Sequence, residues 1–382
     1  MKELMSRFRP GAELSRAFYN EAVRPVLDRH FPGLVHSAAK LHGGSDVLGF
    51  DTPQSMDHDW GAAKLDLFFT SEDCDVFAKE IGRALAAELP HEFRGLPTDF
   101  LRPEVDGGTI GRVAEGPVSH RMTCTTIDRF FRGYIGLNPL QGMAEADWLV
   151  ITPQYLRTIS SGPVFHDGLG QLTEARNTLS WYPTDVWLYL LACQWGRIDQ
   201  ESPFMARCGD VGDELGSRLV AARMIDELMK LCFLMEREYW PYSKWFGSAF
   251  ARLKAAETLV PIFLAILDSQ AWQERQRHLS VAYICVAEMH NALGLTDFIE
   301  PRTVQFHLRP YQAPEADRFA AALYERIESA TVRQWPRHVG AVAQFVHSTD
   351  VLDSSSRCKR LKVVYAEGAH PSAADDADQP RA

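Results

Sequence analysis

The sequence predicts an α+β protein in which a mixed strand-and-helix part precedes an all-helical part. In roughly the first 150 residues, short β-branched or apolar runs alternate with helical periodicity. From Thr173 onward, apolar residues recur almost wholly at helical spacing. At 382 residues the chain exceeds one typical core. We therefore predict an N-terminal domain over residues 1–150, a helical domain over 151–335, a C-terminal extension over 336–365 and a disordered tail over 366–382.

Local patterns place the elements of the N-terminal part. Residues 12–31 have helical spacing, although Pro25 is an awkward residue inside a helix. Residues 34–44 indicate a short strand, or a helix end, that runs into a turn. Further along the chain we predict a strand over 64–70, a helix over 71–89 and a strand over 119–127.

The clearest pattern of the helical part lies in residues 212–240. It predicts ion pairs four residues apart, Glu214–Arg218 and Asp226–Lys230. The apolar residues of the aromatic-rich stretch over 181–195 are predicted to be core. One apolar stripe is predicted to be the buried face of the long helix: Leu215, Leu219, Ala222, Ile225 and Met229.

Composition excludes several classes of protein. A net charge of −10, from 40 basic and 50 acidic residues, does not indicate a broad surface for duplex nucleic acid. The seven cysteines are scattered and never spaced as Cys-x-x-Cys, which favours reduced thiols in a cytosolic protein over a zinc site or a disulfide framework. The most apolar stretches are shorter than the ~20 residues of a membrane span, and the first residues lack the apolar run of a signal peptide. We expect a cytoplasmic protein with no membrane partner.

Two aspartates separated by one residue form the most informative pattern of the N-terminal part. On an extended strand, Asp57 and Asp59 would point to the same face, because side chains alternate along a strand. Two carboxylates held close together repel each other unless a cation lies between them. Mg²⁺ (or Mn²⁺) takes such oxygen ligands and brings substrate phosphates with it. The pair therefore predicts a divalent metal site.

A glycine-rich turn precedes this pair, with eleven residues between Ser45 and Asp57. Gly43, Gly44 and Ser45 would present backbone N–H groups and a hydroxyl to phosphate oxygens. A phosphate cradle followed by a metal site is what phosphoryl transfer from a nucleotide requires. The alternative is an ordinary solvated turn, since Gly, Ser and Asp are common turn residues.

The combined pattern resembles the signature of the DNA polymerase beta-like nucleotidyltransferase superfamily. Other segments, spread over nearly the whole chain, are similar to a bacterial nucleotidyltransferase-like family, domain of unknown function 4037; they include "DWLVITPQ", "GPVFHD" and "FHLRPYQ". The resemblance implies an N-terminal fold around a small mixed sheet, with a helical domain that closes the substrate cleft. The superfamily signature is carried by Gly44, Ser45, Gly49, Ser55, Asp57 and Asp59.

The resemblance also implies a third carboxylate, which activates the attacking hydroxyl. Asp128, where a predicted strand gives way to a helix, is the preferred candidate, and Asp66 is its competitor. Asp128 is alternatively a plain N-cap of the helix. The sequence departs from the superfamily after Trp60, where "GAAK" delays the expected apolar strand, so we predict a bulge or break there.

An aromatic segment after the long helix, "EYWPYSKWFG", supplies two further candidates. Lys244 would contact nucleotide phosphates or the acceptor, and Tyr242 would stack on a base. The alternative is a helix–helix corner packed with aromatic side chains, with the lysine extended to water. Three other polar sites are predicted to be structural: Arg309, His290–Asn291 and His166–Asp167.

The predicted function is that of a Mg²⁺-dependent nucleotidyltransferase. It would move a nucleoside monophosphate from an NTP, with ATP as the expected donor, to a hydroxyl of a small-molecule or macromolecular acceptor. Asp57 and Asp59 would hold the metals, Gly43–Ser45 the phosphates and Asp128 the attacking oxygen. One alternative is a catalytically degenerate nucleotide-binding or regulatory module of the same fold. A metal phosphohydrolase built on His58–Asp59 and His166–Asp167 is disfavoured, because its ligands belong on helices.

Overall fold

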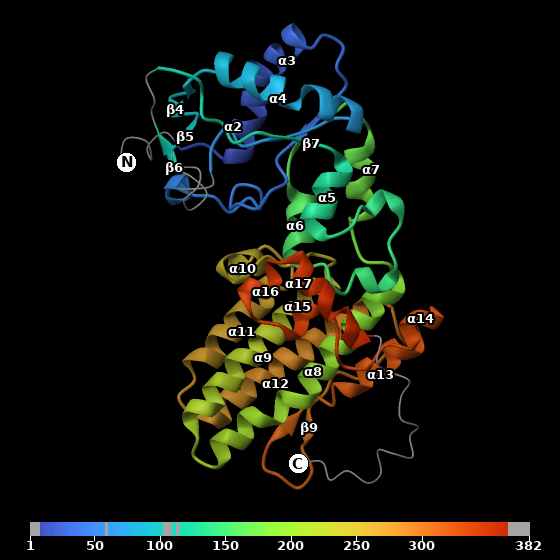
Figure 1. The fold of residues 1–382 in the computed structure, drawn as a ribbon. Coiled ribbons are helices and arrows are strands. Elements are labelled where there is room, and N and C mark those ends of the chain that lie inside the picture. Colours follow the sequence, from blue (N-terminus) through green and yellow to red (C-terminus); the bar gives the residue numbers. More distant parts are fainter. Residues whose placement is uncertain (1–7, 58–59, 102–108, 112–114, 366–382) are drawn as a thin grey trace. The chain divides into compact units, whose positions relative to one another are not determined.

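The computed structural model describes residues 8–57, 60–101, 109–111 and 115–365 (Figure 1). The chain divides into two compact units. The first contains residues up to 143 together with 154–180, and the second contains 144–153 and the chain from 181 onward. Residues 154–180, which the sequence groups with the helical domain, thus belong to the first unit. The tail predicted over 366–382 lies outside the described residues.

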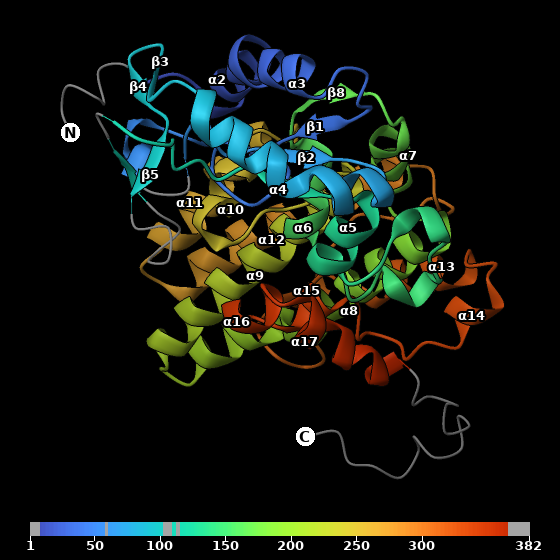
Figure 2. The same cartoon turned by 45° about the horizontal axis from the view of Figure 1, so that its top comes forward.

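The first unit is built on a four-stranded sheet of order β7–β2–β1–β8. Figure 2 labels three of these strands, β2, β1 and β8, which lie side by side. Strand β1 (Ser37–Ala39) pairs antiparallel with both β2 (Asp66–Phe68) and β8 (Val164–Asp167). Strand β7 (Thr123–Thr125) runs parallel to β2. The predicted small mixed sheet is confirmed, and β2 and β7 lie inside the predicted strands.

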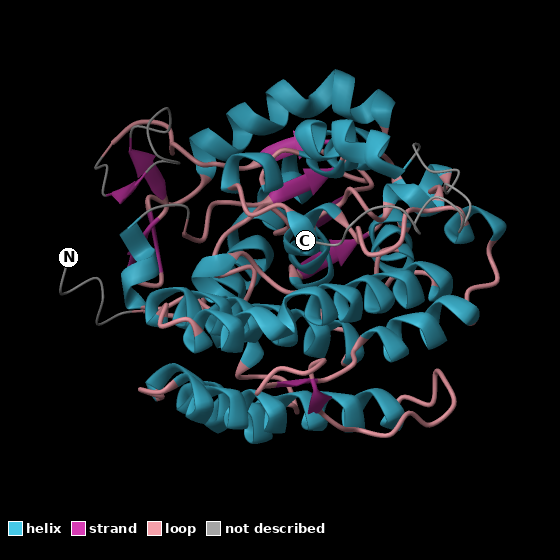
Figure 3. Cartoon of the chain, turned by 90° about the horizontal axis from the view of Figure 1, so that it is seen from below, coloured by secondary structure: helices cyan, strands magenta, loops and turns pink. Residues whose placement is uncertain are grey.

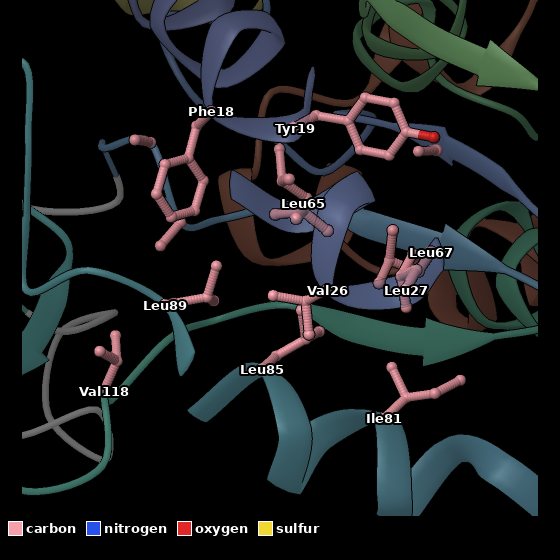
Figure 4. Close-up of a cluster of buried hydrophobic side chains, with 14 of the residues drawn as sticks. Phe18, Tyr19, Val26, Leu27, Leu65, Leu67, Ile81, Leu85, Leu89 and Val118 are labelled. Atoms are coloured by element: carbon pink, nitrogen blue, oxygen red, sulfur yellow. The ribbon is translucent and has the colours of Figure 1, made fainter. Parts of the chain in front are cut away.

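Three helices contribute to the apolar cluster on one face of this sheet. They are α2 (Gly11–Phe18), α3 (Arg24–His30) and α4 (Ser71–Glu88), and they share the cluster with Leu67 of β2. Figure 4 shows Ile81 and Leu85 of α4 directed toward the layer that holds Leu65 and Leu67. Burial of this cluster is the main source of stability for the unit.

The opposite face of β2 contacts helix α5 (Ile127–Ile135). Phe68 meets Phe130 of this helix edge to face, with ring centroids 5.3 Å apart. Asp66 shares this face with Phe68, because residues two apart on a strand point the same way. The sheet alternation therefore turns Asp66 toward α5 and away from the large apolar cluster.

A π-helical turn accommodates Pro25 in the helix predicted over 12–31. Helix α2 ends at Phe18, residues Tyr19–Val23 form the π-helical turn, and α3 begins at Arg24 with Pro25 in its first turn. Proline lacks an N–H and its ring collides with the carbonyl four residues earlier, so a helix tolerates it only near its start. The local widening lets the two α-helices follow each other directly.

Short hairpins and helices complete the first unit. Part of the segment between α4 and β7 forms two small hairpins, each of two antiparallel strands. The remaining elements of this unit are β3 (Glu92–Phe93), β4 (Leu96–Pro97), β5 (Asp99–Leu101), β6 (Thr109–Gly111), α6 (Pro153–Ser161) and α7 (Gln171–Thr178).

The second unit is almost entirely helical. Figure 3, coloured by secondary structure, shows that helices predominate over strands in the chain. Its longest helix, which begins at Thr184, contains most of the 181–195 stretch predicted as core, and Val186 to Trp195 are all buried. The elements are α8 (Thr184–Asp210), α9 (Glu214–Met235), α10 (Ser243–Phe250), α11 (Ala256–Asp268), α12 (Trp272–Ala292), β9 (Val304–Gln305), β10 (Gln312–Ala313), α13 (Asp317–Glu325), α14 (Ala330–Arg333), α15 (Val342–Phe345), α16 (Thr349–Leu352) and α17 (Ser355–Arg360).

The apolar stripe predicted for α9 is buried only in part, because Ile225 is buried and Met229 is half-buried but the other three residues are exposed. Leu215 and Leu219 are 71% and 63% exposed, and Ala222 is exposed as well. The buried face instead includes Ser217, Ala221, Met224, Leu228 and Leu231. The second half of α9 is apolar on several sides, so the sequence offers competing stripes, and packing against α8 and α12 selects one of them. The two predicted ion pairs are confirmed, at 2.9 Å for Glu214–Arg218 and 2.7 Å for Asp226–Lys230.

Membrane spans and cysteines can also be compared with the structure. In the part of the chain that it describes, no helix has both the length and the apolar character needed to cross a bilayer. All seven cysteines are free, and four of them are buried: Cys74, Cys193, Cys232 and Cys358.

Candidate functional site

The Gly43–Ser45 turn lies just beyond strand β1, where the chain leaves the sheet. In the described part of the chain, nothing accepts a hydrogen bond from the backbone N–H of Gly43, Gly44 or Ser45. A Cβ added to Gly43 would meet no atom within 4 Å, so the turn is open at this residue. Successive N–H donors that lack a protein partner suit an anion such as a phosphate.

A buried ion pair closes the loop that contains this turn. Lys40 Nζ lies 2.5 Å from Asp46 Oδ2, and only 1% of each side chain is exposed. The ammonium also donates hydrogen bonds to Ser15 Oγ at 3.2 Å and to the Gly61 carbonyl at 3.0 Å. These partners compensate the cost of burying the charge. Lys40 precedes the turn and Asp46 directly follows it, so this ion pair fixes both ends of the turn.

Asp51 ties the same loop to the start of helix α2. Its Oδ2 accepts hydrogen bonds from the Gly11 N–H at 2.8 Å and from Trp60 Nε1 at 3.0 Å. A carboxylate at a helix N-terminus is stabilised by the unpaired N–H groups and the helix dipole. A Cβ at Gly11 would lie 2.6 Å from Asp46 Oδ2 and 2.7 Å from Trp60 Nε1, so only glycine permits this approach.

Asp66 supports the two residues that lead into the turn. It is buried on β2, and its Oδ2 accepts a hydrogen bond from the Leu41 N–H at 3.1 Å. Its Oδ1 lies 2.6 Å from Nδ1 of His42, whose ring is 41% exposed. The structure thus places one of the two candidate third carboxylates directly beneath the start of the turn.

The expectation that Asp57 lies on an extended strand is wrong. Residues Pro53–Asp57 form a 3₁₀ turn. The Thr52 N–H donates to Ser55 Oγ at 3.0 Å, and the Ser55 N–H donates to the Thr52 carbonyl at 2.8 Å. Such local bonds of Thr and Ser compete with strand pairing. After Trp60 the chain continues through a turn, and the next strand is β2.

The metal ligands predicted from the sequence fall mostly outside the described residues. Asp59 is among the residues that are not described, and the structure describes Asp57 only by its backbone. Within the described ranges, no group of three or more His, Cys, Asp or Glu residues could hold a metal ion. The donor chemistry itself fits Mg²⁺, because two carboxylates one residue apart supply the hard oxygen ligands that it prefers.

Asp128 lies in the first turn of α5, but it is not the N-cap. Thr126 caps this helix by accepting a hydrogen bond from the Arg129 N–H. The Asp128 carboxylate is bound by Asn138 at 3.0 Å, by Arg132 at 2.9 Å and by Gln141 at 3.3 Å. The Asn138 hydrogen bond, followed by Arg132, holds the pKa of Asp128 below its ordinary value despite some desolvation.

Asp128 does not lie on the side of α5 that faces Asp66 and strand β2. Phe130, which contacts Phe68 on the Asp66 face of the sheet, lies about 200° around the helix from Asp128. The assignment of Asp128 as the third carboxylate stays a prediction.

Lys244 and Tyr242 belong to the second unit and stay exposed. Tyr242 precedes α10 and is 41% exposed, and Lys244 Nζ lies 5.3 Å from the ring centroid of Trp245. Their neighbours Tyr239 and Trp240 are buried, as expected for an aromatic helix corner. The nucleotide-binding roles of Lys244 and Tyr242 stay predictions.

Two histidine sites predicted to be structural have structural contacts. Asp167 follows His166 on β8 and accepts hydrogen bonds from Ser37 Oγ and Thr173 Oγ1, both at 2.6 Å. His290 is fully buried, and burial lowers its pKa to about 4. It accepts a hydrogen bond from Trp195 Nε1 at 3.2 Å.

Sequence reasoning missed Lys40, His42, Asp46 and Asp51. A lysine next to the apolar run of β1 and a histidine directly before two glycines were available signals. Their partners, however, become neighbours only when the loop folds back onto α2 and β2.

Comparisons with known proteins support one of the predicted resemblances. No curated protein matches this chain. A solved structure, a nucleotidyltransferase-like protein from Exiguobacterium sibiricum, is similar with a TM-score of 0.30 and 11% identity over 78% of this chain and 82% of that one. Residues 148–246 match the sequence model of a domain of unknown function, DUF4037, so the predicted resemblance to this family is confirmed for that segment.

Proposed function

We propose that this protein is a nucleotidyltransferase that moves a nucleoside monophosphate from an NTP to a hydroxyl acceptor. The observation that carries the proposal is the Gly43–Ser45 turn beside β1, whose N–H groups have no partner among the described residues. Such a turn would grip the β- and γ-phosphates. Asp57 and Asp59 would hold Mg²⁺ or Mn²⁺, which supplies charge stabilisation during phosphoryl transfer. Asp128 is the proposed acceptor of the hydroxyl proton.

Pyrophosphate release from the purified full-length protein tests this proposal. Each NTP is offered with Mg²⁺ or Mn²⁺ and with pools of cellular acceptors. We expect Asp57→Asn and Asp59→Asn each to lower turnover by about 100-fold or more, because each ligand supports several kcal/mol of charge stabilisation. Asp28→Asn, which changes an exposed carboxylate on α3, is the matched control and should leave turnover unchanged.

Two outcomes would contradict the proposal. Turnover by Asp57→Asn at the wild-type rate would show that this carboxylate holds no catalytic metal. Binding of labelled ATP with no pyrophosphate release under any acceptor condition would instead favour the alternative, a nucleotide-binding or regulatory module.

A further inference from the structure

His42 directly precedes the Gly43–Ser45 turn, and a buried carboxylate holds it. The distance from His42 Nδ1 to Asp66 Oδ1 is 2.6 Å, and the Asp66 side chain is only 3% exposed. The other oxygen of Asp66 accepts the Leu41 N–H. Both oxygens of this carboxylate are therefore engaged by the two residues that precede the turn, which explains why an acid is buried at this position of β2.

The opposite edge of the His42 ring is turned away from Asp66. When Nδ1 faces a carboxylate, Nε2 lies on the far side of the ring and is the second hydrogen-bonding atom of the side chain. In the described ranges, no protein group is bonded to this nitrogen. The ring is packed edge to face against Phe130 and Tyr134 of α5, with centroids 5.1 Å and 5.8 Å away, so its orientation is fixed by packing as well.

Basic groups gather at this end of the turn. Lys64 Nζ donates a hydrogen bond to the Gly43 carbonyl at 3.2 Å, which brings an ammonium group onto the turn itself. His42 precedes the same glycine in the chain. The Lys64 ammonium places positive charge beside the unpaired N–H groups of the turn, and a polyphosphate requires both.

We propose that His42 is a phosphate-binding residue: with both ring nitrogens protonated, it donates Nδ1–H to Asp66 and Nε2–H to a β- or γ-phosphate oxygen of a nucleoside triphosphate. Asp66 is its positioning residue. The inference rests on the proposed function, because the ligand class is the same, but it assigns a contact that the nucleotidyltransferase pattern does not contain. The same contact would bind the pyrophosphate that the reaction releases.

Amide substitutions separate the two edges of the ring. The side-chain amide of Asn occupies the place of Nδ1, whereas that of Gln reaches the place of Nε2. We expect His42→Asn and His42→Ala to bind ATP and inorganic pyrophosphate about 10-fold more weakly, whereas His42→Gln keeps most of the affinity. AMP, which lacks β- and γ-phosphates, should bind all variants equally.

Asp66→Asn should raise KM for ATP with less effect on kcat. Calorimetric titration measures binding, and His278→Asn on α12 is the control.

The outcomes separate this inference from the proposed function. Wild-type affinity in His42→Asn, or an equal loss for AMP, would overturn the assignment. An equal loss in all three His42 variants, with a lowered unfolding temperature, would mean that the ring only supports the turn. If ATP binding depends on His42 but no pyrophosphate is ever released, the proposed catalysis fails and the phosphate contact stands. If the wild type binds neither ATP nor pyrophosphate, both fail.

Discussion

Lys40 and Asp46 bridge the two sides of the Gly43–Ser45 turn from inside the first unit. Lys40 directly follows β1, and Asp46 directly follows the turn. The open donors of the turn therefore lie between two residues that are locked together in a nearly water-free environment. A loop held in this way is preorganised, and it keeps its shape without a ligand.

Removing one member of this bridge should destabilise the first unit strongly. Lys40→Met leaves the Asp46 carboxylate buried without a counter-charge, which costs about 3–5 kcal/mol. The double variant Lys40→Met/Asp46→Leu removes both charges and should recover most of that loss. Denaturant unfolding followed by tryptophan fluorescence measures the difference. A double variant as unstable as the single one would show that the pair acts through packing and not through charge.

Gly43 offers a test of the backbone donors. Gly43→Ala adds a methyl group that meets no atom, so stability and ATP affinity should stay near those of the wild type. Gly43→Pro removes the N–H, and we expect it to weaken ATP binding by about 10-fold. Equal binding by the two variants would show that this N–H does not contact the ligand.

His91 should make stability depend on pH. Its Nδ1 lies 2.7 Å from Asp99 Oδ2, and this contact raises the pKa of His91 above its ordinary value. A group whose pKa is raised on folding stabilises the folded state fully below its unfolded pKa of about 6.5, and it loses that contribution as pH rises through the folded pKa. The wild type should therefore have a higher unfolding midpoint than His91→Gln, and this difference should be larger at pH 6 than at pH 8.5. A difference that grows toward high pH would refute this sign.

Two leucines of α9 test which face of the helix is buried. Leu228 is fully buried and Leu219 is 63% exposed. Leu228→Ala should cost about 2–5 kcal/mol, because it opens a cavity. Leu219→Ala should change the free energy of unfolding by no more than about 0.5 kcal/mol. Comparable losses at both positions would mean that Leu219 is covered in solution.

The sequence predicted those features that depend on neighbours along the chain. Helix α4 and strand β2 lie in segments whose local composition predicts them, and the ion pairs of α9 follow from spacing alone. The turn at Gly43–Ser45 was predictable in the same way, because glycine and serine at this spacing have few other uses.

Features that depend on distant contacts could not be predicted. The strand expected at Asp57 gives way to a 3₁₀ turn, because Thr52 and Ser55 bond to each other. The buried face of α9 depends on which helices pack beside it. The supports of the turn reach it from α2 and β2, and no local pattern pairs Lys40 with Asp46 or His42 with Asp66.

The order of strands in the sheet has a consequence for anyone who trims this protein. Strand β8, which covers one edge of β1, comes from residues 164–167, after the chain has left the first unit and returned to it. A fragment that stops at residue 150 would retain β1, β2 and β7 but expose the β1 edge. Bare strand edges recruit other chains, so such a fragment should aggregate. The control is a 1–180 fragment in which a short linker replaces residues 144–153. We expect the 1–150 fragment to self-associate and the control fragment to stay monomeric.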